Sequence, residues 1–198
     1  MPETPSRKEE THERIVRAAA RAIRRLGYNG VGVAEIMSEV GLTHGGFYAH
    51  FKNKTALLAE AADRAGAEGV QSLEKAARGK AGKSLWSLVD AYLSDVHLKS
   101  PELGCPVVAV GTETARQPPE VRSAATRRIR ELVGLIERQM VDWGKPGNHD
   151  NALATLSLLV GTMVIARAVD DPALAKSIRR AGREFLRRGL PAAQSESD

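Results

Sequence analysis

The hydrophobic and polar positions along this chain repeat with the spacing of amphipathic helices. Between residues 13 and 26 apolar side chains recur at i, i+3, i+4 and i+7, and Gly27 follows as a stop signal. Upstream, Ser6 and Glu9 have the spacing of a capping box. The same apolar spacing predicts a short helix over residues 33–40. The alternation typical of strands does not appear in the sequence, so an all-α fold is expected.

Two further helical segments follow closely. Thr43 is a suitable N-cap for a short helix that runs to His50, and Asn53 can cap a long helix that begins near Lys54. A two-turn helix, a glycine-containing turn and a second short helix have the arrangement of a helix-turn-helix. The long helix is expected to bend near Gly66 and Gly69. Pro119 is expected to be the first residue of one later helix, and Asp171 the N-cap of the last. The later helices are expected at residues 84–99, 104–116, 119–143, 150–169 and 172–188.

Composition narrows the class of protein. The chain has 198 residues, of which 42% are hydrophobic and 27% charged, with a formal net charge of +5. Its single cysteine, Cys105, excludes an intramolecular disulfide framework and a multi-cysteine zinc site, and it fits a reducing compartment. We expect no metal, no cofactor and a cytoplasmic location. The most apolar stretch, residues 152–169, carries polar residues and falls short of the roughly 20 residues of a spanning helix, so no membrane span is expected.

Residues 43–54 carry the most specific chemistry. Phe47 and Phe51 share one face of a helical wheel and are expected in the core, whereas Gly45 and Gly46 point to the other face. Each glycine costs about 1 kcal/mol relative to alanine inside a helix, so an exposed pair indicates that something approaches the backbone closely. A DNA major groove would do so. His44 and Tyr48 could reach a base edge or a phosphate, Thr43 the phosphodiester chain, and Lys52 and Lys54 the phosphate charge.

The first predicted helix also has a basic flank. As a set, these side chains either form a solvated face or add to a DNA surface, and the sequence leaves both open. They are Arg14, Arg17, Arg21, Arg24 and Arg25.

The segment from Val40 to Lys54, together with Gly27-Tyr28 and Val33-Ala-Glu-Ile36, resembles the N-terminal signature of TetR-family transcriptional repressors over the first 55 to 60 residues. The resemblance implies a DNA-binding domain at 1–53 and a helical ligand-binding and dimerisation domain at 54–190, and the composition of residues 191–198 indicates a polar tail. This sequence differs from the family signature at Gly32, where the family often has Ser or Thr, and at His44, where the family frequently has Lys or Arg. By this resemblance Thr43, His44, Gly45 and Gly46 face the groove, and Tyr48, His50 and Lys54 contact phosphates.

The sequence of the second half of the chain gives less information about the ligand than the first half gives about DNA binding. Gly104-Cys105-Pro106 resembles the start of the sixth helix in one branch of the family, in the region that relays ligand binding. Cys105 is either a small buried hydrophobe or a redox or electrophile sensor. A thiol enzyme using Cys105 and His97 is disfavoured, because no further catalytic motif accompanies them. The large or polarisable residues that could line a pocket, or simply pack in the core, are Trp86, Tyr92, His97, Cys105, Met140, Trp143 and Met163.

The last two helices are expected to pair with those of a second copy in a four-helix bundle. Gly161 and Gly182 would permit close contact, and the arginines at 179, 180, 183, 187 and 188 would form a solvated rim. The expected interface comprises Leu153, Leu156, Val160, Met163 and Val164 with Ile178, Ala181, Gly182 and Phe185, while Leu159, Ile165 and Val169 face the core.

These features predict a ligand-responsive transcriptional repressor that binds a palindromic DNA operator as a homodimer and responds to a small-molecule inducer. The alternative within this class is regulation through oxidation or modification of Cys105. A helical interaction module that does not bind DNA is a further alternative, and the glycine pair counts against it.

Overall fold

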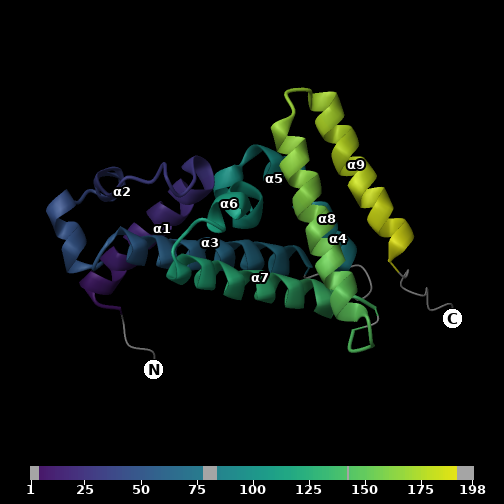
Figure 1. The fold of residues 1–198 in the computed structure, drawn as a ribbon, viewed down its shortest axis with the longest axis horizontal. Coiled ribbons are helices and arrows are strands. Elements are labelled where there is room, and N and C mark those ends of the chain that lie inside the picture. Colours follow the sequence, from purple (N-terminus) through teal and green to yellow (C-terminus); the bar gives the residue numbers. More distant parts are fainter. Residues whose placement is uncertain (1–4, 78–83, 142, 191–198) are drawn as a thin grey trace. The chain divides into compact units, whose positions relative to one another are not determined.

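The computed structural model describes residues 5–77, 84–141 and 143–190, and the described residues are helical with no strand (Figure 1). The predicted all-α class is therefore confirmed. The elements are α1 (Arg7–Leu26), α2 (Val33–Glu39), η1 (His44–Ala49), α3 (Lys54–Ala77), α4 (Ser84–Tyr92), α5 (Asp95–Lys99), η2 (Pro101–Leu103), α6 (Pro106–Thr114), α7 (Pro119–Gln139), α8 (Asn148–Ala168) and α9 (Pro172–Gly189).

Local capping determines where several helices begin, as the sequence predicts. The Ser6 hydroxyl accepts from the backbone N–H of Glu9 at 3.3 Å, and the Glu9 carboxylate accepts from that of Ser6 at 2.7 Å, which completes the capping box. Asn53 Oδ1 accepts from the backbone N–H of Ala56 at the start of α3. Asp171 caps α9, and Pro119 opens α7.

Other expectations need correction. The short helix expected between Thr43 and His50 is the 3-10 helix η1, His44–Ala49, and not an α-helix. The segment expected at 84–99 is two helices, because Ser94 caps α5 by accepting from the backbone N–H of His97 at 3.1 Å. Helix α7 ends at Gln139, four residues early. Helix α3 continues through the position of Gly66, where a Cβ would overlap Arg128 of α7, so this glycine permits the close crossing of two helices.

The chain divides into two compact units. The first holds the residues up to Glu68 together with Pro101–Arg128, and the second holds Gly69–Ser100 and the residues from Ile129 onward. Helix α6 and the first half of α7 thus pack in the same unit as the N-terminal helices. The functional division at residues 53 and 54 stays a prediction, and the polar tail 191–198 lies outside the described residues.

The core of the first unit is built around α1. Ile15 and Ile23 of α1, Phe47 of η1, Leu57 of α3 and Val121 of α7 are almost completely buried in one cluster. At a conventional rate of about 25 cal/mol per Å² of apolar surface removed from water, such a core is the main source of stability. This cluster attaches the short elements α2 and η1 to the long helices.

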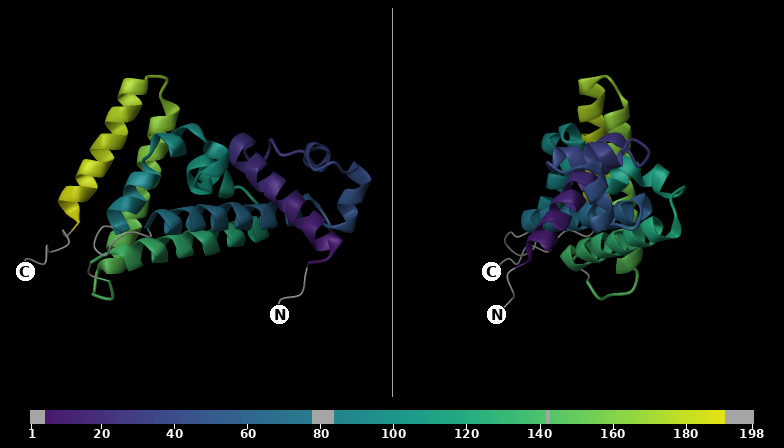
Figure 2. Two further views of the ribbon diagram at one scale, coloured as in Figure 1. Left: turned by 180° about the vertical axis from the view of Figure 1, so that it is seen from behind. Right: turned by 90° about the vertical axis from the view of Figure 1, so that its left-hand side faces the viewer.

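In the second unit α8 and α9 lie side by side as an antiparallel pair (Figures 1 and 2). Gly182 is buried against α8, where a Cβ would lie 2.6 Å from Thr162 Oγ1. It therefore permits close packing within one chain, which the sequence reading assigned to contact between copies. Ile165, expected in the core, is exposed.

The arginines of α9 also differ from expectation. Arg179 is buried, donates to the backbone carbonyl of Leu93 at 2.8 Å, and pairs with Asp95. Arg183 pairs with Asp90 at 2.6 Å, and the Arg187 guanidinium lies 5.5 Å from the ring centre of Trp86. Arg179 and Arg183 therefore attach α9 to the segment of α4 and α5 and are not part of a solvated rim, whereas Arg180, Arg187 and Arg188 are exposed, as predicted.

Among the described residues, α8 is long and apolar enough to cross a membrane by length and composition alone. The expectation that this stretch is too short was wrong, because the helix begins at Asn148 and has 21 residues. Core helices of soluble proteins pass the same test, and α8 buries Leu159 and Met163 completely in its own unit.

Candidate nucleic-acid interface

The helix-turn-helix is built from α2, a glycine turn and η1. Helix α2 begins after Gly32, which provides no side-chain cap, as the sequence indicates. Gly41 adopts φ +74°, and the N–H of Leu42 donates to the carbonyl of Met37 at 2.8 Å. A left-handed residue after a helix is the usual place for glycine. The turn directs η1 away from α2 within five residues.

Two aromatic rings attach η1 to the core. Phe47 and Phe51 are buried, and their rings stack with centroids 5.5 Å apart. The prediction that these rings are core residues is confirmed. Because one side of η1 is anchored in this way, its opposite side is left at the surface.

The residues predicted to contact DNA lie together in this segment. Thr43, His44, Gly45, Tyr48 and Lys54 are exposed, and Gly46 and His50 are half-buried. Tyr48 has 67% of its surface exposed, and its ring meets that of His44 edge-on at 6.3 Å. The Thr43 side chain makes no capping hydrogen bond, which leaves its hydroxyl at the surface.

The two glycines differ in their surroundings. A Cβ on Gly45 would have no neighbour within 4 Å, whereas one on Gly46 would lie 3.7 Å from Met37 Cε. Gly45 is therefore the glycine whose backbone is open to an approaching ligand. The sequence places both glycines on an exposed face, and the structure shows Gly45 exposed and Gly46 half-buried.

His50 lies beside a second histidine. Its ring is 6.0 Å from that of His12, which stacks on Phe51 at 4.5 Å and contacts Glu60 Oε2 through Nε2 at 2.6 Å. The buried Nδ1 of His50 has no hydrogen-bond partner among the described residues. Burial, then the charges of His12 and Lys8, lower the pKa of His50 below its ordinary value.

The arginines of α1 mostly bind within the protein. Arg24 is buried, donates to the carbonyl of Ala65 and pairs with Glu68 at 2.6 Å. Arg14 donates to the carbonyl of Val40, and Arg21 pairs with Glu39. The reading of this flank as uniformly solvated or DNA-facing is thus wrong for Arg24. No sequence signal local to α1 distinguishes Arg24 from its neighbours.

The residues predicted to line a ligand pocket do not all share one environment. Tyr92, Met140 and Met163 are buried in the second unit, and Trp86 and His97 are half-buried there. His97 lies edge-on to Tyr92 at 4.7 Å, and burial is the main cause of its lowered pKa. The two remaining candidates differ: Trp143 is 63% exposed, and Cys105 is buried in the first unit as the N-cap residue of α6.

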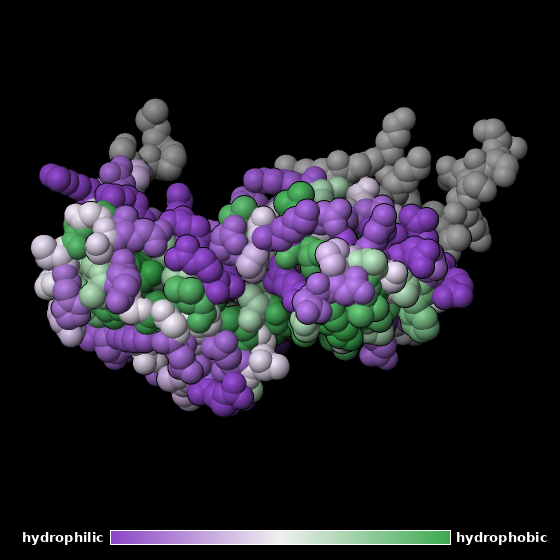
Figure 3. Space-filling view, turned by 90° about the horizontal axis from the view of Figure 1, so that it is seen from above, coloured by the Kyte–Doolittle hydropathy of each residue, from purple (hydrophilic) through white to green (hydrophobic). Residues whose placement is uncertain are grey.

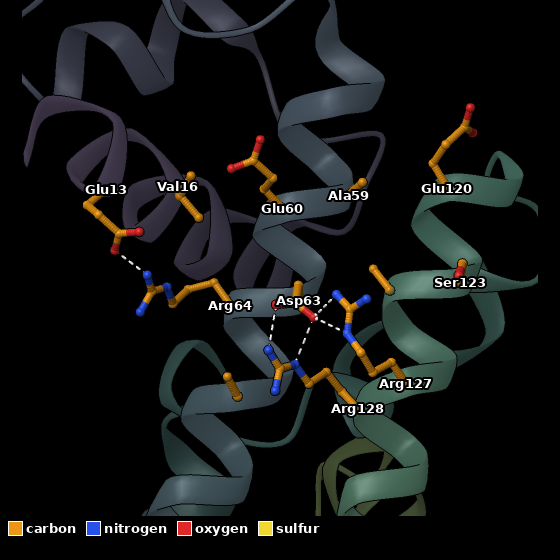
Figure 4. A pocket seen from close by; sticks show the side chains of 12 residues that line it. Glu13, Val16, Ala59, Glu60, Asp63, Arg64, Glu120, Ser123, Arg127 and Arg128 are labelled. Atoms are coloured by element: carbon orange, nitrogen blue, oxygen red, sulfur yellow. Dashed lines mark hydrogen bonds and ion pairs between the residues drawn. The ribbon is translucent and has the colours of Figure 1, made fainter. Parts of the chain in front are cut away.

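A groove of about 490 Å³ lies within the first unit, between α1, α3 and α7 (Figure 4). Its floor is an ion cluster in which Asp63 lies between the guanidinium groups of Arg127 and Arg128. Arg64 pairs with Glu13 on the opposite wall. Ligand pockets are mostly apolar, and this groove is lined by charged side chains that pair with one another. It contains none of the seven predicted pocket residues, and their role as a ligand site stays a prediction.

The outer side of α8 and α9 carries large apolar side chains. Figure 3 shows green hydrophobic surface among the purple polar side chains in several places. Several exposed large apolar side chains on two neighbouring helices are typical of an interaction site. The exposed apolar residues of the two helices are Leu153, Val164, Ile165, Leu174 and Phe185.

These observations define a class of protein: an all-helical chain in which a helix-turn-helix with an exposed second element is attached to a larger helical region. Residues 15–61 match the family model described as "Bacterial regulatory proteins, tetR family". The N-terminal part of the chain is therefore similar to the helix-turn-helix domain of TetR-family transcriptional regulators, which supports DNA-binding regulation.

Full-length relatives agree with this assignment. Two uncharacterized HTH-type transcriptional regulators from strains of Mycobacterium tuberculosis are 28% identical over 187 residues, which is 90% of this chain and 95% of theirs. A regulator of Bacillus subtilis, YerO, is 41% identical over 54 residues, which is 27% of this chain and 19% of that protein.

Solved structures share the fold. A TetR regulator from Chloroflexus aurantiacus has a TM-score of 0.76 at 22% identity, with 94% of this chain and 98% of that chain covered. The reduced form of Escherichia coli NemR has a TM-score of 0.77 at 16% identity, with 93% and 99% covered.

Proposed function

We propose that this chain is a ligand-responsive repressor that binds a palindromic DNA operator as a homodimer. The observation that carries the proposal is the geometry of η1. Its aromatic side is buried, while Gly45 opens the backbone and His44 and Tyr48 extend from the surface. An element with a buried anchor and an exposed polar face suits insertion into a major groove.

The DNA contacts follow from exposure and chemistry. Thr43, His44, Gly45 and Gly46 face the bases, with His44 offering ring nitrogens that can donate or accept. Tyr48, His50 and Lys54 bind phosphates, which fix the register of the protein on the duplex without reading its sequence.

The dimer forms through α8 and α9. Covering the exposed apolar side chains of these helices with the same surface of a second copy removes them from water and produces a four-helix bundle. Two-fold symmetry then presents two copies of η1 to half-sites about 34 to 36 Å apart, or a larger groove-matched distance.

The effector is a small molecule bound in the second unit. Tyr92, His97 and Met163 offer an aromatic ring, an imidazole and a thioether to such a ligand. To act as an inducer, the ligand must bind the DNA-free conformation more tightly, by about 1.4 kcal/mol for each tenfold loss of operator affinity. The proposal includes a cytoplasmic location and no enzymatic activity.

Redox regulation through Cys105 is the second candidate. Cys105 is the N-cap residue of α6, next to the backbone N–H groups at the start of that helix. A solved structure with a similar fold is described as a reduced form. The burial of Cys105 opposes this candidate, because a sensor thiol must be reached by its oxidant.

The test begins with selection of duplexes from a random pool by the full-length protein. The expected result is a palindromic consensus, together with a dimer by light scattering at micromolar concentration. Recovery of unrelated duplexes, or a monomer in solution, would overturn the proposal.

A further inference from the structure

Helix α2 is a weak element by its own sequence. It has seven residues, Gly32 provides no side-chain cap, and no basic residue occupies its last turn. Helices shorter than about 12 residues are marginal in isolation, so α2 depends on contacts from the rest of the unit.

Helix α1 supplies two of these contacts at the C-terminal end of α2. Arg14 Nη2 donates to the backbone carbonyl of Val40 at 2.7 Å, and Arg21 Nη2 donates to Glu39 Oε1 at 2.8 Å. The last carbonyls of a helix carry partial negative charge and lack partners within the helix, so a guanidinium there is favourable. Arg14 thus provides, from 26 positions earlier in the chain, the cation that α2 lacks.

The carbonyl that Arg14 holds has a particular place in the fold. Val40 is the C-cap residue of α2, and Gly41 follows with φ +74° to begin the turn. Residue His44 then opens η1. A shift at Val40 is therefore transmitted directly to the direction in which η1 leaves the turn.

We propose that Arg14 is a positioning residue for DNA reading. By holding the Val40 carbonyl it fixes the orientation of η1, and it contributes to operator specificity without touching DNA. This role rests on the proposed function of η1 as the operator-reading element. It differs from a phosphate contact, which an exposed arginine in a DNA-binding unit would ordinarily suggest.

Salt dependence separates the two roles. Each phosphate contact makes the plot of log affinity against log salt steeper by about 0.9, and it strengthens binding to all duplexes alike. A positioning residue leaves that slope unchanged and alters the ratio of specific to non-specific affinity.

The experiment uses the full chain with two probes: a duplex selected by the wild type from a random pool, and a scrambled duplex of the same length. Fluorescence anisotropy over a range of KCl concentrations is measured for four proteins. They are the wild type, Arg14→Ala, Arg17→Ala and Lys54→Ala. Arg17→Ala is the matched control, because it removes the same charge from an exposed α1 side chain whose Nε is 3.8 Å from Glu13. Lys54→Ala is the reference for loss of a phosphate contact.

Arg14→Ala is expected to weaken binding to the selected duplex about tenfold, the effect of losing one charge-assisted hydrogen bond, with less than about twofold change on the scrambled duplex. Its salt slope should match that of the wild type. Arg17→Ala should leave the ratio unchanged, and Lys54→Ala should weaken both duplexes and lower the slope by about 0.9.

Equal losses on both duplexes with a lower slope would make Arg14 a phosphate contact and overturn the proposal. Unchanged affinities would also overturn it while leaving the proposed function intact, and a wild type that prefers no duplex would overturn both. If Arg14→Ala is unfolded by circular dichroism, Arg14→Met, which keeps the aliphatic stem, should show the same signature. Loss of folding in Arg14→Met as well would assign Arg14 to the stability of the fold and reject a positioning role.

Discussion

The exposed face of η1 and the exposed face of α8 and α9 differ in chemistry. On η1 the exposed groups are an imidazole, a phenol and open glycine backbone, whereas on α8 and α9 they are side chains such as Val164, Ile165 and Phe185. Polar groups and backbone N–H groups suit the hydrated, charged surface of a duplex. Large apolar side chains suit a partner that excludes water. The exposed face of η1 therefore suits DNA, and the exposed face of α8 and α9 suits an apolar protein surface.

The largest effect is expected when charge is placed on the apolar surface. Phe185 is 63% exposed in the single chain, so Phe185→Asp should leave the protomer folded. In the proposed dimer the carboxylate would be buried without a partner, which costs several kcal/mol, so operator affinity should fall on the order of a hundredfold. Light scattering should report a monomer.

Arg180→Asp, which changes the net charge by two units against one for Phe185→Asp, is a stringent control for this variant. Arg180 is exposed on the same helix, five residues before Phe185 and so about 140° away around the helix axis. The Arg180→Asp protein should remain dimeric. A Phe185→Asp protein that is dimeric and binds the operator normally would place the interface elsewhere.

A smaller loss is expected from Gly45→Leu. The protein has open space around a Cβ at this position, so thermal stability should not fall. On DNA the new side chain would meet the bases, and overpacking of 1–3 kcal/mol corresponds to a loss of roughly ten- to a hundredfold. Gly45→Ala should show a smaller loss in the same titration. Intact operator affinity in Gly45→Leu would contradict close approach of the groove to this backbone.

The sequence predicted the local features of this fold well. The capping residues Ser6, Asn53 and Asp171, and the buried rings of Phe47 and Phe51, are where the spacing predicted them. These features depend on residues within one or two helical turns of each other, so a single sequence contains the information that specifies them.

Long-range pairing could not be predicted in the same way. Arg24 meets Glu68 from 44 positions away, and Arg179 meets the carbonyl of Leu93 from 86 positions away. On a helical wheel both arginines look like surface residues, and only the tertiary fold supplies the partners that make burial of their charge tolerable. The placement of Cys105 in the same unit as the helix-turn-helix has the same origin.

A weaker effect is expected from pH. The pKa of His50 lies below its ordinary value of 6.5 in the free protein, chiefly because of burial. A DNA phosphate favours the cation, so binding takes up a proton and affinity rises as pH falls below about 6.5, by less than about tenfold per pH unit for one group. The same shift lowers folding stability as pH falls through this range, because the unfolded chain binds the proton more readily.

Titration of the selected duplex at several pH values measures this effect, with melting followed separately. His50→Gln should remove most of the acid enhancement, and the exposed His44→Gln is the comparison at a position predicted to face bases. If His50→Gln keeps the full pH dependence, His50 is not the phosphate-binding group.

The smallest effect is expected from Cys105→Ser. In the ligand-responsive reading Cys105 serves as a small buried side chain at the start of α6, so the variant should bind the selected duplex like the wild type, before and after treatment with peroxide. In the redox reading, peroxide releases the wild type from DNA and leaves Cys105→Ser bound. Peroxide titrations of both proteins, with reductant added afterwards to test reversal, separate the readings. If peroxide releases only the wild type from DNA, oxidation of the Cys105 thiol, and not a ligand in a pocket, controls DNA binding.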